Sequence, residues 1–307
     1  MIDYQITGWM KTTFSLKGTV LPRIFLRVSL FTGVTLLLLL FADQWVTTIQ
    51  FSPLMHSLIG TALGLVLVFR NNGSYDRYWE GRKKWGGIVN SSRNLARAAQ
   101  SYTPDWVPLA SLICAFPHAL KHQLRSENSK ETLLNYASEE QVEVWLSHPN
   151  PALMINTDMS RWVANQVQQH HLTVEFAQRI ETYIGFLMDH QGACERILKT
   201  PVPFAHAIHV RQLLFIYLLT LPLVLIPIFG WYSVLAITLI GMALLGIEEA
   251  GVEIEDPFGH DYNDLPLNSI CDVIHRDVRA LLCCHHPDDM EQIPRLEPKV
   301  IDSFVRD

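Results

Sequence analysis

The chain is poor in charge, and long stretches of it carry none. Of its 307 residues, 18% are Asp, Glu, Lys or Arg and 49% are hydrophobic. The hydrophobic residues come in blocks, and this combination does not suit a soluble protein of this size. The formal net charge of −6 argues against nucleic acid as a partner, because proteins that bind nucleic acid usually present basic surfaces.

Cysteine and catalytic motifs are scarce as well. The five cysteines are scattered without a CxxC pair, so we expect no disulfide framework and a reducing compartment. The sequence has no Walker loop, GxSxG, HExxH or dinucleotide fingerprint, so it predicts neither an enzyme nor a cofactor. The run from Cys283 to His286 could hold zinc only with ligands from elsewhere, because adjacent side chains diverge.

Four apolar blocks are long enough to span a membrane as helices, at residues 24–42, 53–69, 212–230 and 231–247. Arg27, near the start of the first block, is expected to snorkel towards water. The connections at 43–52 and 229–232 contain no Lys or Arg, so they are predicted to be external. Both termini and the long polar middle region are then cytoplasmic, which makes the chain a multi-pass protein of the cell membrane.

The predicted fold class is all-α, with four transmembrane helices and a helical cytosolic region, because no strand-like alternation is present. Asp158 and Thr173 are plausible helix N-caps. The chain divides into an N-terminal interfacial segment with two spans (1–69), a cytosolic region (70–211), two further spans (212–247) and a cytosolic C-terminal segment (248–307). Cytosolic helices are predicted at 85–102, 109–124, 139–146, 158–169, 173–198 and 268–282.

The second span carries two patterns. Gly60 and Gly64 form a small-xxx-small pair, which lets two helices pack closely in lipid, although such pairs also arise by chance. Leu58, Ala62 and Val66 recur every four residues and share one side of the helix. That row fits a lipid-facing or core surface, and in a symmetric oligomer it could line a hydrophobic constriction.

An acidic run follows the fourth span and includes Glu248, Glu249, Glu253, Glu255 and Asp256. Such a run could gather cations at a pore mouth. It could equally form ion pairs with the basic cluster between residues 70 and 84.

Three stretches together carry a family resemblance: FRNNGSYDRYWEGRKKWG at 69–86, QGACERILKTPVP at 191–203 and DPFGHDYNDLPLNSI at 256–270. With the four-span topology, they resemble the bestrophin family of ion channels in its short bacterial branch. The resemblance covers nearly the whole chain. It implies a homopentamer around one central pore.

The resemblance also implies two constrictions. Aligning the arginine of the first stretch with the family's arginine places Leu58, Ala62 and Val66 on a hydrophobic neck. A second constriction, deeper in the cytosolic part, is made in the family by one aliphatic side chain per subunit. Ile180 is the preferred candidate for it and Phe176 the second.

Animal members of the family bind calcium through carboxylates in the string after Pro-Phe-Gly. In this chain Asp256 replaces the leading asparagine, and Asp261 and Asp264 fall on acidic positions of the string. The residues around them do not continue it. Because calcium favours several charged oxygen ligands, the resemblance implies a depleted metal site.

The sequence therefore predicts a passive channel for small inorganic ions, embedded in membrane lipid. The acidic run and the net charge slightly favour cations. The alternatives are an anion channel of the same architecture, a membrane-anchored enzyme and a transporter. A transporter is disfavoured because the predicted spans contain no ionisable Asp, Glu, Lys or Arg except Arg27 near one end.

Overall fold

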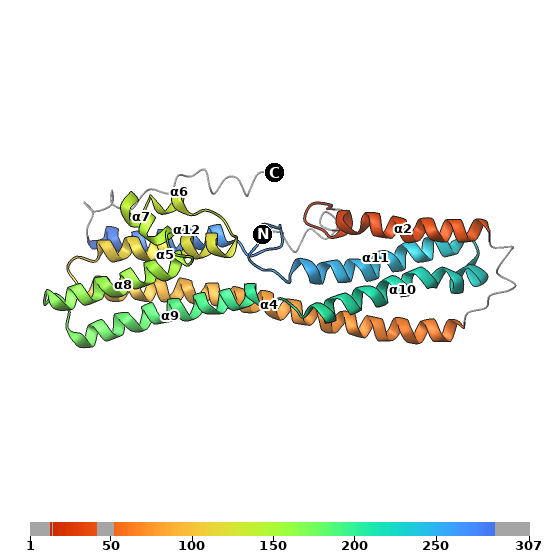
Figure 1. The fold of residues 1–307 in the computed structure, drawn as a ribbon, viewed down its shortest axis with the longest axis horizontal. Helices are drawn as coiled ribbons and strands as arrows, with labels where there is room; N and C mark the ends of the chain where they lie inside the picture. Colours follow the sequence, from red (N-terminus) through yellow and green to blue (C-terminus); the bar gives the residue numbers. More distant parts are fainter. Residues whose placement is uncertain (1–12, 14, 42–51, 286–307) are drawn as a thin grey trace. The chain divides into compact units, whose positions relative to one another are not determined.

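The structure, a computed structural model, describes residue 13 and residues 15–41 and 52–285. Every regular element in those ranges is a helix, which confirms the all-α fold class (Figure 1). More than half of the predicted N-terminal interfacial segment and nearly all of the first external connection lie outside the described residues.

The chain forms two compact units. The first contains the residues up to Trp79, Thr200–Pro257 and Asp261–Asp264. The second contains Glu80–Lys199, Phe258–His260 and the residues from Leu265 onward.

The first unit is a bundle of long apolar helices that run side by side in alternating directions (Figure 1). Within the described ranges, four helices are long and apolar enough to cross a membrane, as the sequence predicts. Gly230 ends the third of them with φ +53°, a backbone conformation that glycine adopts without strain, and so allows the tight turn into the fourth. The helices are α2 (Leu21–Leu40), the first part of α4 (Pro53–Tyr102), α10 (Phe204–Phe229) and α11 (Tyr232–Glu253).

An aliphatic core holds this bundle together. Ile24 and Phe31 of α2, Leu67 of α4, Leu218 of α10 and Leu245 of α11 are among its buried members. Only 22–33% of each span's apolar window is buried within the protomer. The remaining apolar surface is therefore available to lipid, to other subunits or to a pore.

The second unit is built around α5 (Val107–Leu124), whose residues are buried on nearly every side. The helix packs against α8 (Pro151–Gln168), α9 (Val174–Lys199) and α12 (Leu267–His285). Trp85, Phe116 and Trp145 are among its largest fully buried side chains. The second part of α4 and the short helices α6 (Lys130–Leu133) and α7 (Glu139–Leu146) complete the unit.

Among the predicted cytosolic helices, two starts differ from the structure by more than two residues. The predicted start at residue 85 lies inside α4, which is continuous from Pro53. Helix α8 begins at Pro151, and Asn150 caps it by accepting a hydrogen bond from the Leu153 N–H at 3.0 Å. The predicted cap, Asp158, lies inside α8, where its carboxylate accepts a hydrogen bond from Trp145 Nε1 at 2.7 Å.

Candidate functional site

The row predicted to face a pore lies on α4 within the first unit. Leu58 is 59% exposed and Ala62 is also exposed, whereas Val66 is partly buried against the aliphatic core. The exposed surface continues instead through Leu65 and Phe69, which are 57% and 64% exposed. The exposed apolar face of α4 therefore runs through Leu58, Ala62, Leu65 and Phe69, which share one side of the helix, and Val66 lies at its edge.

The two glycines of α4 have different surroundings. A Cβ added to Gly60 would lie 2.7 Å from the hydroxyl of Tyr217 on α10, so Gly60 marks a close approach within the protomer. A Cβ on Gly64 would meet no atom within 4 Å. Only the first glycine is therefore at a helix contact inside this chain.

The two candidates for the cytosolic constriction also differ. Ile180 is fully buried in the core of the second unit. Phe176, one turn earlier on α9, is 40% exposed and stacks on Tyr102 with ring centroids 4.0 Å apart. A side chain that lines a pore must reach the surface of its subunit, and of these two Phe176 does so.

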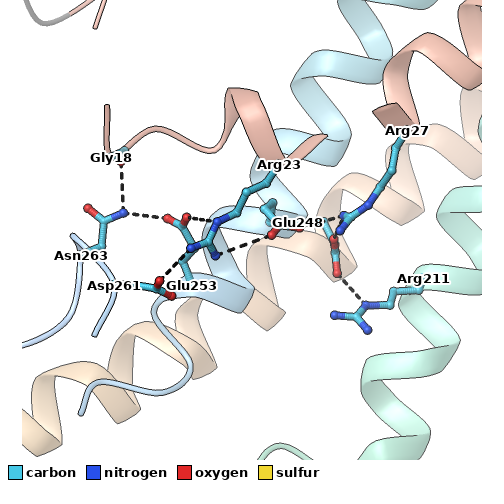
Figure 2. A network of polar contacts seen from close by, with 9 residues as sticks. Gly18, Arg23, Arg27, Arg211, Glu248, Glu253, Asp261 and Asn263 are labelled. Carbon is cyan, nitrogen blue, oxygen red and sulfur yellow. Dashed lines mark hydrogen bonds and ion pairs between the residues drawn. The ribbon is translucent and has the colours of Figure 1, made fainter. Parts of the chain in front are cut away.

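The most extensive polar structure is a network at one end of the spanning helices (Figure 2). Glu248 of α11 lies at its centre, with Oε1 2.6 Å from Arg70 Nη1 and 2.9 Å from Arg211 Nε. Arg27 Nη1 lies 3.5 Å from the other oxygen of Glu248 and 2.8 Å from Glu249. The side chains of Arg70 and Glu248 are 1% and 2% exposed, so each charge depends on the other for compensation.

Arg23 extends the network to the loop after α11. Its guanidinium lies 3.2 Å from Glu253 and 2.9 Å from Asp261. Asn263 donates hydrogen bonds to Glu253 at 2.7 Å and to the carbonyl of Gly18 at 3.2 Å (Figure 2). The network thus sets four arginines against four carboxylates, those of Glu248, Glu249, Glu253 and Asp261.

This arrangement changes the interpretation of the acidic run. Its first three glutamates are paired in the protomer, chiefly with arginines from α2 and α10 that the sequence analysis did not assign to them. From the basic cluster, Arg70 joins the network, and Arg77 donates to the backbone carbonyl of Glu255 at 3.1 Å. Arg27 is half exposed, but it points to the glutamates as well as to water. One signal was available: each of the first three spans carries an arginine at its predicted cytoplasmic end.

The three carboxylates considered for calcium do not gather around one point. Asp261 pairs with Arg23, and a carboxylate oxygen of Asp264 accepts the Asp261 backbone N–H at 2.7 Å. Asp256 lies exposed just beyond α11. Among the described residues, no three His, Cys, Asp or Glu side chains are grouped so that they could hold a metal ion. The run from Cys283 to His286 lies outside what is described of the side chains.

A second polar cluster lies in the core of the second unit. The hydroxyl of Tyr136 is 2.9 Å from His275 Nδ1 and 3.3 Å from His118 Nε2. Burial, with smaller contributions from the nearby Lys121 and His122, lowers the pKa of His118 to about 3. His118 is therefore neutral at physiological pH and takes part as a hydrogen-bonding core residue.

Bundled apolar helices closed at one end by a buried charge network define a multi-span helical membrane protein. Comparison with known proteins identifies its family. The family model described as "Bacterial/Fungal Bestrophin protein" matches residues 1–280. The chain belongs to this family, as the sequence resemblance indicated.

Relatives and solved structures agree with this assignment. The chain is 36% identical over 286 residues to the voltage-dependent anion channel-forming protein alr2987 of Nostoc sp., covering 89% of this chain and 91% of the relative. It is 31% identical to the similarly named YneE of Escherichia coli K12, with 88% and 90% covered. A crystal structure of a bacterial bestrophin homolog from Klebsiella pneumoniae superposes with a TM-score of 0.81 at 28% identity, covering 84% of this chain and 98% of the homolog.

Proposed function

We propose that this chain is a subunit of an anion channel. The observation that carries the proposal is the likeness, at 36% identity over most of both chains, to proteins named as voltage-dependent anion channel-forming. This reverses the slight preference for cations drawn from the sequence. Three glutamates of the acidic run on which that preference was based, Glu248, Glu249 and Glu253, are paired with Arg23, Arg27, Arg70 and Arg211, so they offer little net attraction to cations.

The test is a reversal-potential measurement on purified protein in planar bilayers under an asymmetric KCl gradient. Chloride selectivity moves the reversal potential towards the chloride equilibrium value. Replacing chloride by a large organic anion on one side should then suppress current in one direction. A reversal potential at the potassium value would refute the proposal and restore the cation interpretation.

The proposed assembly is a homopentamer in which the exposed apolar row of α4 faces a common axis. We retain Leu58 and Ala62, which were predicted from the sequence, in this row. The row continues through Leu65 and Phe69, because Val66 packs against its own protomer. Rings of such side chains would make a narrow wall without hydrogen-bond partners, where ions lose hydration and conduction is limited by dewetting.

Single-channel recordings can test this register. Leu65→Ala and Phe69→Ala should widen the neck and raise conductance or open probability. Val66→Ala and Leu63→Ala should instead loosen the core that they contact, with little change in conduction. If Val66→Ala opened the channel and Leu65→Ala had no effect, the original row would be right. Light scattering of the detergent complex tests the fivefold stoichiometry independently.

For the cytosolic constriction, we propose Phe176 in place of Ile180, the candidate preferred from the sequence. The exposed ring of Phe176 is held in place by its stacking on Tyr102. Phe176→Ala should therefore increase conductance without unfolding the protein. Ile180→Ala should lower thermal stability, because it leaves a cavity in the second unit, and the pore should be unaffected.

A further inference from the structure

A cavity of about 440 Å³ opens on the first unit where α2, α10 and α11 meet. Its apolar wall includes Leu30 and Phe31 of α2 and Phe215 of α10, and the last two rings pack edge to face with centroids 5.7 Å apart. Leu30 and Phe215 are about half exposed, so they form an open rim. The wall therefore presents apolar surface to whatever enters from outside the protomer.

One end of the same cavity is charged. Arg27 and Arg211 line it, with side chains 48% and 50% exposed, and both point towards Glu248 (Figure 2). The network engages Nη1 of Arg27 and Nε of Arg211. A guanidinium group has five N–H donors in a planar fork, which is more than these pairs use.

The charge at this end is positive on balance. Two arginines, Arg27 and Arg211, and one carboxylate, that of Glu248, line the cavity, whereas the network as a whole, with four arginines and four carboxylates, is neutral. On each helix the apolar rim residue follows the arginine by three or four positions, Leu30 after Arg27 and Phe215 after Arg211, so both lie on one helix face. A ligand that fits has an anionic group next to a hydrocarbon chain.

We propose that this cavity binds an anionic phospholipid. Its phosphate accepts hydrogen bonds from Arg27 and Arg211, and an acyl chain lies over Leu30 and Phe215. The position suits such a ligand, because the arginines stand at one end of membrane-spanning helices and the apolar wall runs along the spans. Arginine also matches phosphate oxygens in geometry as well as in charge. The proposal goes beyond channel activity and does not depend on ion selectivity.

The test measures the thermal shift of the purified, delipidated full-length protein in neutral detergent when dioleoylphosphatidylglycerol is added. Native mass spectrometry of the same samples counts the retained lipid. We expect phosphatidylglycerol to raise the melting temperature and dioleoylphosphatidylcholine to leave it nearly unchanged. Arg211→Gln should weaken phosphatidylglycerol binding about tenfold, since one charge-assisted hydrogen bond is lost.

Two further variants keep the test decisive if Arg211→Gln folds poorly. Leu30→Trp fills the rim without touching a charge and should also reduce the lipid-induced shift. Arg23→Gln removes an arginine of the same network that does not line the cavity, and should keep the full shift.

Several results would overturn the proposal. One is an equal shift with both lipids, and another is loss of the shift in Arg23→Gln but not in Leu30→Trp. A shift of the same size with glycerol 3-phosphate alone would show a free-anion site without an acyl chain. A change of oligomer mass in Leu30→Trp, with lipid binding unaltered, would show that a second copy of the chain covers the cavity.

Discussion

At the scale of single residues, the main feature is a pair of buried charges. Arg70 and Glu248 are almost fully enclosed, and their side chains come from positions 178 residues apart. A buried pair contributes little net stability compared with an apolar pair, but removing one partner leaves the other charge without compensation. Replacing either residue should therefore destabilise the first unit, although the intact pair adds little to the free energy of folding.

Glu248→Gln should therefore destabilise the protein by about 3–5 kcal/mol, because it leaves Arg70 without a balancing charge. Glu80→Gln is a matched control, since it breaks an exposed pair with Arg196 and should change the stability by only about 0–1 kcal/mol. Thermal unfolding in detergent compares the two variants. Equal losses would mean that the network is not buried in the assembled protein.

His118 makes a prediction about pH. Its folded-state pKa of about 3 lies below the ordinary value of 6.5, so between these values the unfolded chain holds a proton that the folded chain does not. The stabilising contribution is complete above about pH 6.5 and is lost as the pH falls towards 3, by up to about 1.4 kcal/mol per pH unit.

Denaturation curves across this pH range check the assignment. His118→Gln should flatten the acid-side slope, whereas replacing the exposed His170 by Asn should leave it as in the wild type. Lys121, His122 and His275 lie near His118 and add to the depression of its pKa. An unchanged slope in His118→Gln would assign the acid sensitivity to another group.

Among the helices, α4 contains most of the residues that have a role in the proposed function. Its exposed apolar row, its two glycines and its buried Arg70 lie within three turns or so of one another. Gly60 makes a close contact within the protomer, whereas Gly64 faces open space, where we propose a contact with another subunit.

Replacing Gly60 and Gly64 by leucine should therefore have different effects on stability and assembly. Gly60→Leu should loosen the packing of α4 on α10, because the new side chain would meet Tyr217, and it should lower thermal stability. Gly64→Leu has room within the protomer, so it should leave the fold intact and weaken the oligomer. Size-exclusion chromatography with light scattering separates these effects. A native oligomer with native conductance in Gly64→Leu would show that Gly64 is at no subunit contact.

Several elements could be predicted from the sequence because their signals are local. The four apolar blocks gave the spans, and Glu139–Leu146 was bounded correctly by its polar flanks. The start of α8 was predicted wrongly because Asp158 resembles an N-cap. Its carboxylate instead accepts a hydrogen bond from the indole N–H of Trp145. The pairing of the acidic run with the basic cluster was predicted and is confirmed for Arg70. Nothing in the sequence near Glu248 shows that Arg27 and Arg211 also converge on it. The burial of Ile180 and Val66 likewise depends on tertiary packing.

For the whole molecule, cysteine labelling tests the predicted orientation in the membrane. Lys and Arg are absent from the predicted external connections, so the second unit is predicted to be cytoplasmic. In a cysteine-free background, Ser126→Cys should resist a membrane-impermeant maleimide in intact cells and react after lysis, because residue 126 is exposed on the second unit. Tyr232→Cys, at the predicted external turn, should label in intact cells. The reverse pattern would invert the topology.

The charge network also has a consequence for biosynthesis. Synthesis proceeds from the N-terminus, so Arg23, Arg27, Arg70 and Arg211 all leave the ribosome before Glu248, Glu249 and Glu253, which belong to the last span. Until α11 has been synthesised, the four arginine side chains lack their counter-ions, and Arg70 cannot take up its buried position. The last span therefore supplies the charges that complete the first unit. A chain that ends before residue 248 lacks these carboxylates, so we expect that it cannot form the packed first unit.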